Sequence, residues 1–181
     1  MAENLTPLER RDIVRHLALD LVDHIQVTRP PVWVESLFKR ELTACESALC
    51  AVETLADLLA AFYVWSSASG GQLLVPPDMP LVERRYRLAS ELFRAISHAL
   101  QERLHGLSRL LAPDLDEYAG YFGRVLLAPD RLVLDYRRQG NTLHGFAETF
   151  LIPQPVADLR WADLVHADQG PQATLPGFSV S

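Results

Sequence analysis

The chain has 181 residues, of which 49% are apolar and 22% charged, which is typical of one globular domain and not of a disordered segment. Its 17 basic and 23 acidic side chains give a net charge of -6, which argues against a large phosphate-binding face. No stretch approaches the roughly 18 uncharged apolar residues of a membrane span, and the first residues lack the pattern of a secretion signal, so we expect a cytoplasmic protein.

The first predicted helix begins at Pro7. Thr6 can cap it, and Glu9 can complete a capping box. The helix is expected to run to about Ile25 and to stop before the Pro30-Pro31 pair, because each proline disfavours helix at the residue before it.

Two further helices are expected over residues 34–42 and within 45–60. Cys45 and Cys50 fall in the second of these segments. Five positions turn a helix through about 500°, so the two thiols do not share a face. We expect two reduced thiols that pack as small apolar groups, and no zinc site.

Residues 61–75 predict a β-hairpin. Residues 61–65 are aromatic and β-branched, residues 66–71 are rich in serine and glycine, and residues 72–75 form another apolar run. Prolines at positions 76 and 77 end the second strand.

The rest of the chain predicts helices. The strongest covers residues 81–107, with an apolar stripe formed by Leu88, Leu92, Phe93, Ile96, Leu100 and Leu104. A second begins at Pro113 and is interrupted at Pro129, and two more cover 142–151 and 156–165. The sequence thus predicts an α+β, mainly α, fold with a small antiparallel sheet or hairpin, a single domain over residues 1–166 and an irregular tail over 167–181.

Two of these segments carry a family resemblance. Residues 85–98 read RYRLASELFRAISH, and residues 116–129 read DEYAGYFGRVLLAP. They resemble the signature helices of the ImmA/IrrE zinc metallopeptidases, which read approximately R-F-x-x-A-H-E-x-G-H-x-x-x-H and E-x-x-A-N-x-F-A-x-x-L-L-M-P. The matching positions are Arg85 or Arg87, Ala89, Glu91, His98, Ala119, Phe122, Leu126, Leu127 and Pro129. Residues 21–42, 71–75 and 146–160 resemble other parts of the same domain.

The catalytic residues of the family are replaced. The resemblance puts Ser90 and Arg94 where the two zinc-binding histidines belong, and leaves Glu91 and one downstream acid, Asp116 or Glu117 depending on register. A zinc hydrolase of this type needs imidazole ligands, whereas a guanidinium stays protonated and has no lone pair to donate. We therefore expect no intact catalytic site and no cofactor. We also expect the Arg94 guanidinium within about 4 Å of Asp116 or Glu117.

The resemblance implies a function. Active members look like intracellular peptidases that cleave helix-turn-helix repressors. An inactive relative could keep the cleft and use it to bind a protein, either such a repressor or another subunit of a complex. This predicts a protein-binding or regulatory module that binds neither membrane nor nucleic acid.

Two alternatives stay open. The first is an active metal-dependent endopeptidase with displaced ligands, for which His98, Glu102 and His105 lie on one helix face, although an exposed polar face explains that spacing as well. The second is a helix-turn-helix DNA-binding protein built from residues 142–151 and 156–165. Its reading helix would carry two aspartates and one arginine, which is unfavourable for contact with phosphates.

Overall fold

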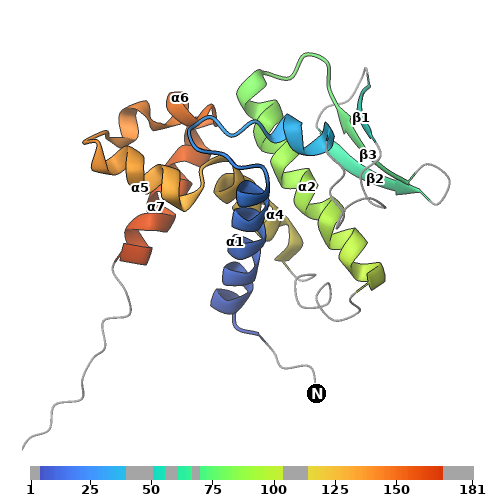
Figure 1. Cartoon of the computed structure of the whole chain (residues 1–181). Coiled ribbons are helices and arrows are strands. Elements are labelled where there is room, and N and C mark those ends of the chain that lie inside the picture. Colours follow the sequence, from blue (N-terminus) through green and yellow to red (C-terminus); the bar gives the residue numbers. More distant parts are fainter. Residues whose placement is uncertain (1–4, 40–50, 56–60, 67–69, 104–113, 169–181) are drawn as a thin grey trace, which may run out of the picture.

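A computed structural model describes residues 5–39, 51–55, 61–66, 70–103 and 114–168 (Figure 1). The fold is α+β and mainly helical, as predicted. The described helices are α1 (Pro7–His24), α2 (Leu81–Arg103), α4 (Leu115–Leu127), α5 (Asp130–Arg138), α6 (Phe146–Phe150) and α7 (Gln154–Asp168). The shorter elements are the 3-10 helices η1 (Val34–Lys39) and η3 (Leu143–Gly145) and the strands β1 (Ala51–Thr54), β2 (Phe62–Ser66) and β3 (Gly70–Val75).

Helix α1 begins with the predicted capping box. The Glu9 backbone N–H donates to Thr6 Oγ1 at 3.3 Å, and the Thr6 backbone N–H donates to Glu9 Oε2 at 2.7 Å. Both hydrogen bonds satisfy backbone donors that a helix start otherwise leaves without partners. After His24 the chain passes the two prolines and enters η1, so the described part of the helix predicted over 34–42 is a 3-10 helix, and residues 40–42 lie outside the described residues.

The sheet has three strands in the order β1-β3-β2. Strands β2 and β3 pair antiparallel, with Tyr63 opposite Leu73, which confirms the predicted hairpin. Strand β1 pairs parallel to β3, with Val52 opposite Leu73, so the helix predicted within 45–60 is wrong at Ala51–Thr54. Long-range pairing with β3 outweighs the local helix preference of that sequence. Cys45 and Cys50 lie outside the described residues.

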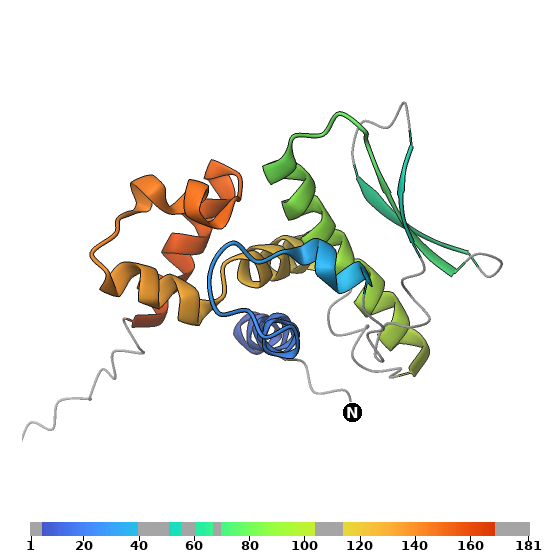
Figure 2. The same cartoon turned by 45° about the horizontal axis from the view of Figure 1, so that its top comes forward.

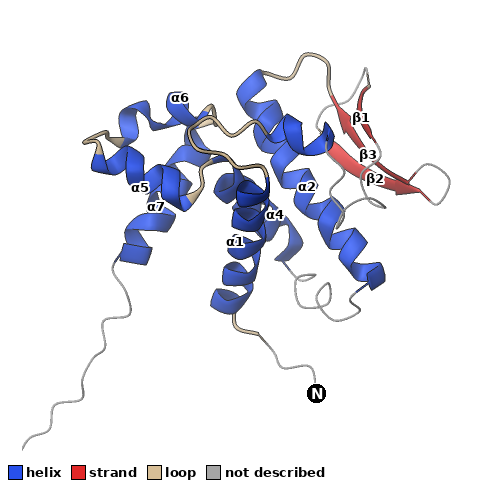
Figure 3. Cartoon of the chain, viewed as in Figure 1, coloured by secondary structure: helices blue, strands red, loops and turns tan. Residues whose placement is uncertain are grey.

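Helix α2 lies between the sheet and the other helices (Figure 3). Leu73 and Val75 of β3 are fully buried on the inner side of the sheet. On the other side α2 packs against α4, with the Phe93 and Phe122 ring centroids 5.1 Å apart. The predicted core between these helices is confirmed, because one cluster of buried side chains contains Leu88, Leu92, Phe93, Ile96, Phe122, Leu126 and Leu127.

The C-terminal helices lie on the far side of α2 from the sheet, beside α1 (Figure 2). Phe146 and Phe150 are fully buried there, with ring centroids 4.5 Å apart. Helix α6 is shorter than the predicted helix over 142–151, and Leu151 ends it in the left-handed conformation, with φ of 51°. Helix α7 runs to Asp168, two residues into the predicted tail, and residues 169–181 lie outside the described part. None of the described helices is both long and apolar enough to cross a membrane.

Two aspartates connect α1 to the C-terminal helices. Asp130 accepts hydrogen bonds from Arg15 Nε, at 2.7 Å, and from Arg160. Asp163 accepts from Arg124 Nε at 2.6 Å and from Arg11 Nη2 at 3.3 Å. These four arginines and two aspartates, here called the arginine network, join α1, α4, α5 and α7, and the sequence analysis did not predict them.

Candidate functional site

The two signature helices lie very close to each other where Ser90 of α2 meets Gly123 of α4. A Cβ atom on Gly123 would lie 2.7 Å from Ser90 Oγ and 3.2 Å from the Ser90 backbone nitrogen, both closer than ordinary van der Waals contact. Ser90 is buried, and its hydroxyl donates to the Tyr86 carbonyl at 3.0 Å. The absence of a side chain at Gly123 thus brings the two helix backbones together beside the candidate site.

Both oxygens of the buried Glu91 carboxylate have donors. Oε2 accepts the Tyr63 backbone N–H of strand β2 at 3.0 Å, and Oε1 accepts Arg94 Nε at 3.1 Å. The carboxylate therefore connects the sheet to α2 and is already engaged at each oxygen. The sequence alone could not reveal the donor in β2, because it lies 28 positions away on the chain.

Arg94 reaches across to α4 as expected. Its Nη1 lies 2.7 Å from Asp116 Oδ1, so Asp116 and not Glu117 is the acid that faces α2. Glu117 is exposed. Burial alone would lower the pKa of Arg94, but hydrogen bonds and charge from Asp116 and Glu91 raise it above its ordinary value. The guanidinium is therefore a permanent cation between two carboxylates.

The donor set at this place does not fit zinc. Zinc needs deprotonated nitrogen, sulfur or oxygen ligands with free lone pairs. Here Ser90 Oγ donates to a backbone carbonyl, Glu91 is engaged at both oxygens, and Arg94 is bonded to Asp116. What the arrangement can do is join α2 to α4 through a cation supplied by the chain itself.

The residues of the two alternatives are only partly described. His98 is half-buried, and its ring centroid lies 6.2 Å from that of Tyr63. The Glu102 side chain and His105 lie outside the described residues. In the predicted DNA-reading helix, Arg160 is buried; its Nε donates to the Ala128 carbonyl at 2.8 Å, so it does not face solvent.

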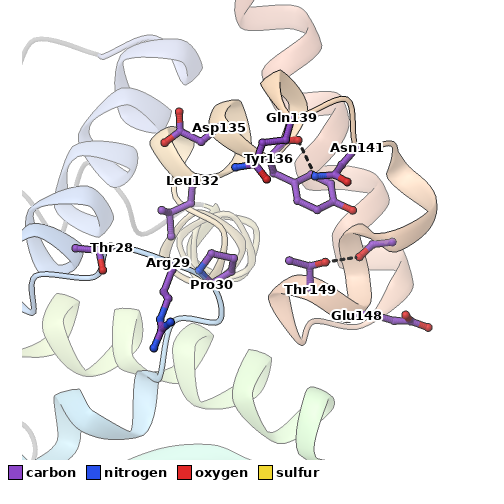
Figure 4. A pocket seen from close by; sticks show the side chains of 11 residues that line it. Thr28, Arg29, Pro30, Leu132, Asp135, Tyr136, Gln139, Asn141, Glu148 and Thr149 are labelled. Atoms are coloured by element: carbon purple, nitrogen blue, oxygen red, sulfur yellow. Dashed lines mark hydrogen bonds between the residues drawn. The ribbon is translucent and has the colours of Figure 1, made fainter.

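Two hollows of the described surface lie elsewhere, on either side of the segment from Thr28 to Pro30. The first has a volume of about 570 Å³ and is walled by this segment, α5 and the chain around α6 (Figure 4). Its wall is braced by two hydrogen bonds, from Asn141 Nδ2 to the Tyr136 carbonyl at 3.1 Å and from Thr149 Oγ1 to the Gly145 carbonyl at 2.8 Å.

The second hollow has a volume of about 550 Å³ and extends from Ile25 to Ser36. Neither hollow is lined by Ser90, Glu91, Arg94 or Asp116. The sequence analysis did not identify these surfaces, although an arginine before two prolines and a tryptophan soon after them was a visible signal.

No protein-family model matches the chain, and no curated protein matches it. The resemblance to the ImmA/IrrE peptidases therefore rests on the sequence patterns alone, chiefly those of the two signature helices.

Proposed function

We propose that this chain is a non-catalytic domain of the ImmA/IrrE type that acts as a protein-binding, regulatory module. The observation that carries the proposal is the double contact of Arg94, which bonds Glu91 on its own helix and Asp116 on α4. The resemblance assigns these two carboxylates to the metal site of an active enzyme.

The replacement has a physical reason. A buried carboxylate without a cation is costly, and Glu91 is buried, whereas the exposed Asp116 adds a weaker demand for positive charge. A guanidinium provides this charge and forms directed hydrogen bonds, but it supplies neither a Lewis acid nor a ligand. The chain keeps the connection between the helices and gives up the chemistry, which is what a binding module needs. The partner we propose is a helix-turn-helix repressor or another subunit of a complex, in the cytoplasm.

A zinc titration tests the loss of catalysis. Purified wild-type chain should bind no stoichiometric zinc in competition with a chromogenic chelator, whereas Ser90→His with Arg94→His should bind one ion per chain. The matched control is Ser90→His with Arg94→Ala, which has one imidazole fewer and should bind much more weakly. One tightly held zinc per wild-type chain would instead support an active peptidase.

Native purification tests the binding role. The full chain, isolated under mild conditions, should co-migrate with an intact protein partner in size-exclusion chromatography and cross-link to it. A chain that migrates alone at every concentration tested would contradict the proposal. A partner recovered in cleaved form would support the peptidase alternative.

A further inference from the structure

The second hollow contains a large aromatic side chain that is held in place yet exposed. Trp33 is 53% exposed. Its carbonyl accepts hydrogen bonds from the Ser36 backbone N–H at 3.0 Å and from Ser36 Oγ at 2.7 Å. The Arg85 guanidinium lies 5.0 Å from the centre of its ring. The ring is therefore positioned before any partner binds.

Arg85 itself is fixed. It is fully buried and donates to the carbonyls of Val32 and Leu151, the latter at 3.3 Å. Val32 precedes Trp33 and Leu151 belongs to the turn after α6, so Arg85 connects the backbone next to Trp33 with that turn. An exposed tryptophan on a rigid support is the kind of residue that dominates protein interfaces, because it loses little conformational freedom on binding.

The charge that lines the second hollow is positive. Its lining is mostly apolar, with Ile25, Val27 and Pro31 beside Trp33, and Arg29 is its only charged lining residue. Arg29 is exposed, and no residue in the described part of the chain forms an ion pair or hydrogen bond with it. A complementary ligand presents an apolar side chain and a carboxylate close together.

We infer that the second hollow, here called the Trp33 groove, binds an acidic and apolar segment of a protein partner. This inference rests on the proposed function and names the surface and the chemistry of the partner. The first hollow shares Thr28, Arg29 and Pro30 with the second, but it is also lined by Asp135 and Glu148, whose charges oppose an acidic segment, so the groove is confined to the side that holds Trp33. The Trp33 ring receives the apolar side chain, and Arg29 pairs with the carboxylate.

Two fluorescein-labelled peptides of about 12 residues test the inference. One alternates Leu with Glu and the other alternates Leu with Lys, so each presents one apolar side when it is extended. Fluorescence anisotropy should give a Kd for the Glu peptide at least about tenfold lower than for the Lys peptide. Arg29→Glu should reverse the preference, and Trp33→Ala should weaken binding by about tenfold or more. The control is Leu159→Ala, which removes a leucine of α7 that is 55% exposed and should leave binding unchanged.

Several results would overturn the inference: no binding of either peptide by the wild-type chain, equal binding of both, or unchanged binding by Arg29→Glu. Arg29 is exposed, so its reversal tests the charge even if Trp33→Ala proves unstable in a thermal melt. The failure of the proposed function is a different result. A native partner retained equally by wild type and Arg29→Glu would reject the Trp33 groove and leave the binding role standing, whereas a wild-type chain without any partner would reject the binding role itself.

Discussion

The two carboxylates that Arg94 contacts, Glu91 and Asp116, contribute unequally to stability. The Asp116 side chain is 88% exposed, whereas Glu91 is buried. An exposed ion pair contributes at most about 1 kcal/mol to stability, because water screens it, while a buried carboxylate depends strongly on its partners. The contact that matters for stability is therefore the one between Arg94 and Glu91, and Asp116 mainly sets the direction of the guanidinium.

We predict that Arg94→Ala lowers the free energy of unfolding by about 1–3 kcal/mol, since it leaves the Glu91 carboxylate with the Tyr63 N–H and without a cation. Asp116→Ala should cost less than about 1 kcal/mol. Urea denaturation followed by circular dichroism measures both. Equal losses of unfolding free energy for the two variants would show that the exposed contact with Asp116 stabilises the fold as much as the buried contact with Glu91.

Among the elements, the crossing of α2 and α4 depends on a residue without a side chain. Alanine favours helix over glycine by about 1 kcal/mol, so glycine inside α4 has a cost that its packing must offset. At Gly123 close packing offsets this cost, because a Cβ would meet both the side chain and the backbone of Ser90. At Gly120 a Cβ would meet only the Tyr86 hydroxyl, at 3.1 Å, at the end of a side chain that can move.

Gly123→Ala should therefore destabilise the fold by about 1–3 kcal/mol through overpacking. The matched variant Gly120→Ala, in the same helix, should stay within about 1 kcal/mol of wild type. Adding Ser90→Ala to Gly123→Ala removes the atom at 2.7 Å and should recover part of the loss, which a double-mutant cycle measures. If Gly123→Ala is as stable as Gly120→Ala, the backbones are not in contact where the structure has them.

The elements show what sequence patterns can and cannot predict. The capping box predicted the start of α1, and the spacing of apolar residues predicted the core between α2 and α4. Both patterns depend on residues that are only a few positions apart in the chain. Strand β1 could not be predicted, since it exists through its pairing with β3. The choice between Asp116 and Glu117 was open for a similar reason, as one residue of register decides it and only the packed helices fix that register. The arginine network escaped altogether because its partners lie far apart in the chain.

Across the whole molecule, the arginine network connects the first helix to the last. Arg160 is 1% exposed and Asp130 is 8% exposed, so each is costly to leave without its partner. Tyr121 lies within the network, with the Arg11 and Arg124 guanidiniums 4.6 and 4.8 Å from its ring centre. Burial raises the pKa of Tyr121, and the charge of Arg160 opposes the shift.

Asp130→Ala should lower the free energy of unfolding by about 3–5 kcal/mol, because it leaves the Arg160 guanidinium buried and removes the contact to Arg15. The control on the same helix is Asp135→Ala, whose pair with the largely exposed Arg138 should contribute less than about 1 kcal/mol. Hydrogen exchange should also show faster exchange in α1 for Asp130→Ala. Unchanged protection of α1 would mean that its packing on α4 suffices and that the network adds nothing there.

The contact between Arg11 and Asp163 spans 152 positions, and this has a consequence for synthesis on the ribosome. At about 5–20 residues per second, roughly 8–30 s separate the emergence of the two side chains. Throughout that interval the Asp163 carboxylate, to which both Arg11 and Arg124 donate, has not yet been synthesised. If α1 docks on α4 before then, both guanidiniums must remain hydrated. A nascent chain released before α7 would keep this defect permanently. The contact between Arg11 and Asp163 therefore forms only after α7 has been synthesised, and an α1 that docks on α4 before then lacks it.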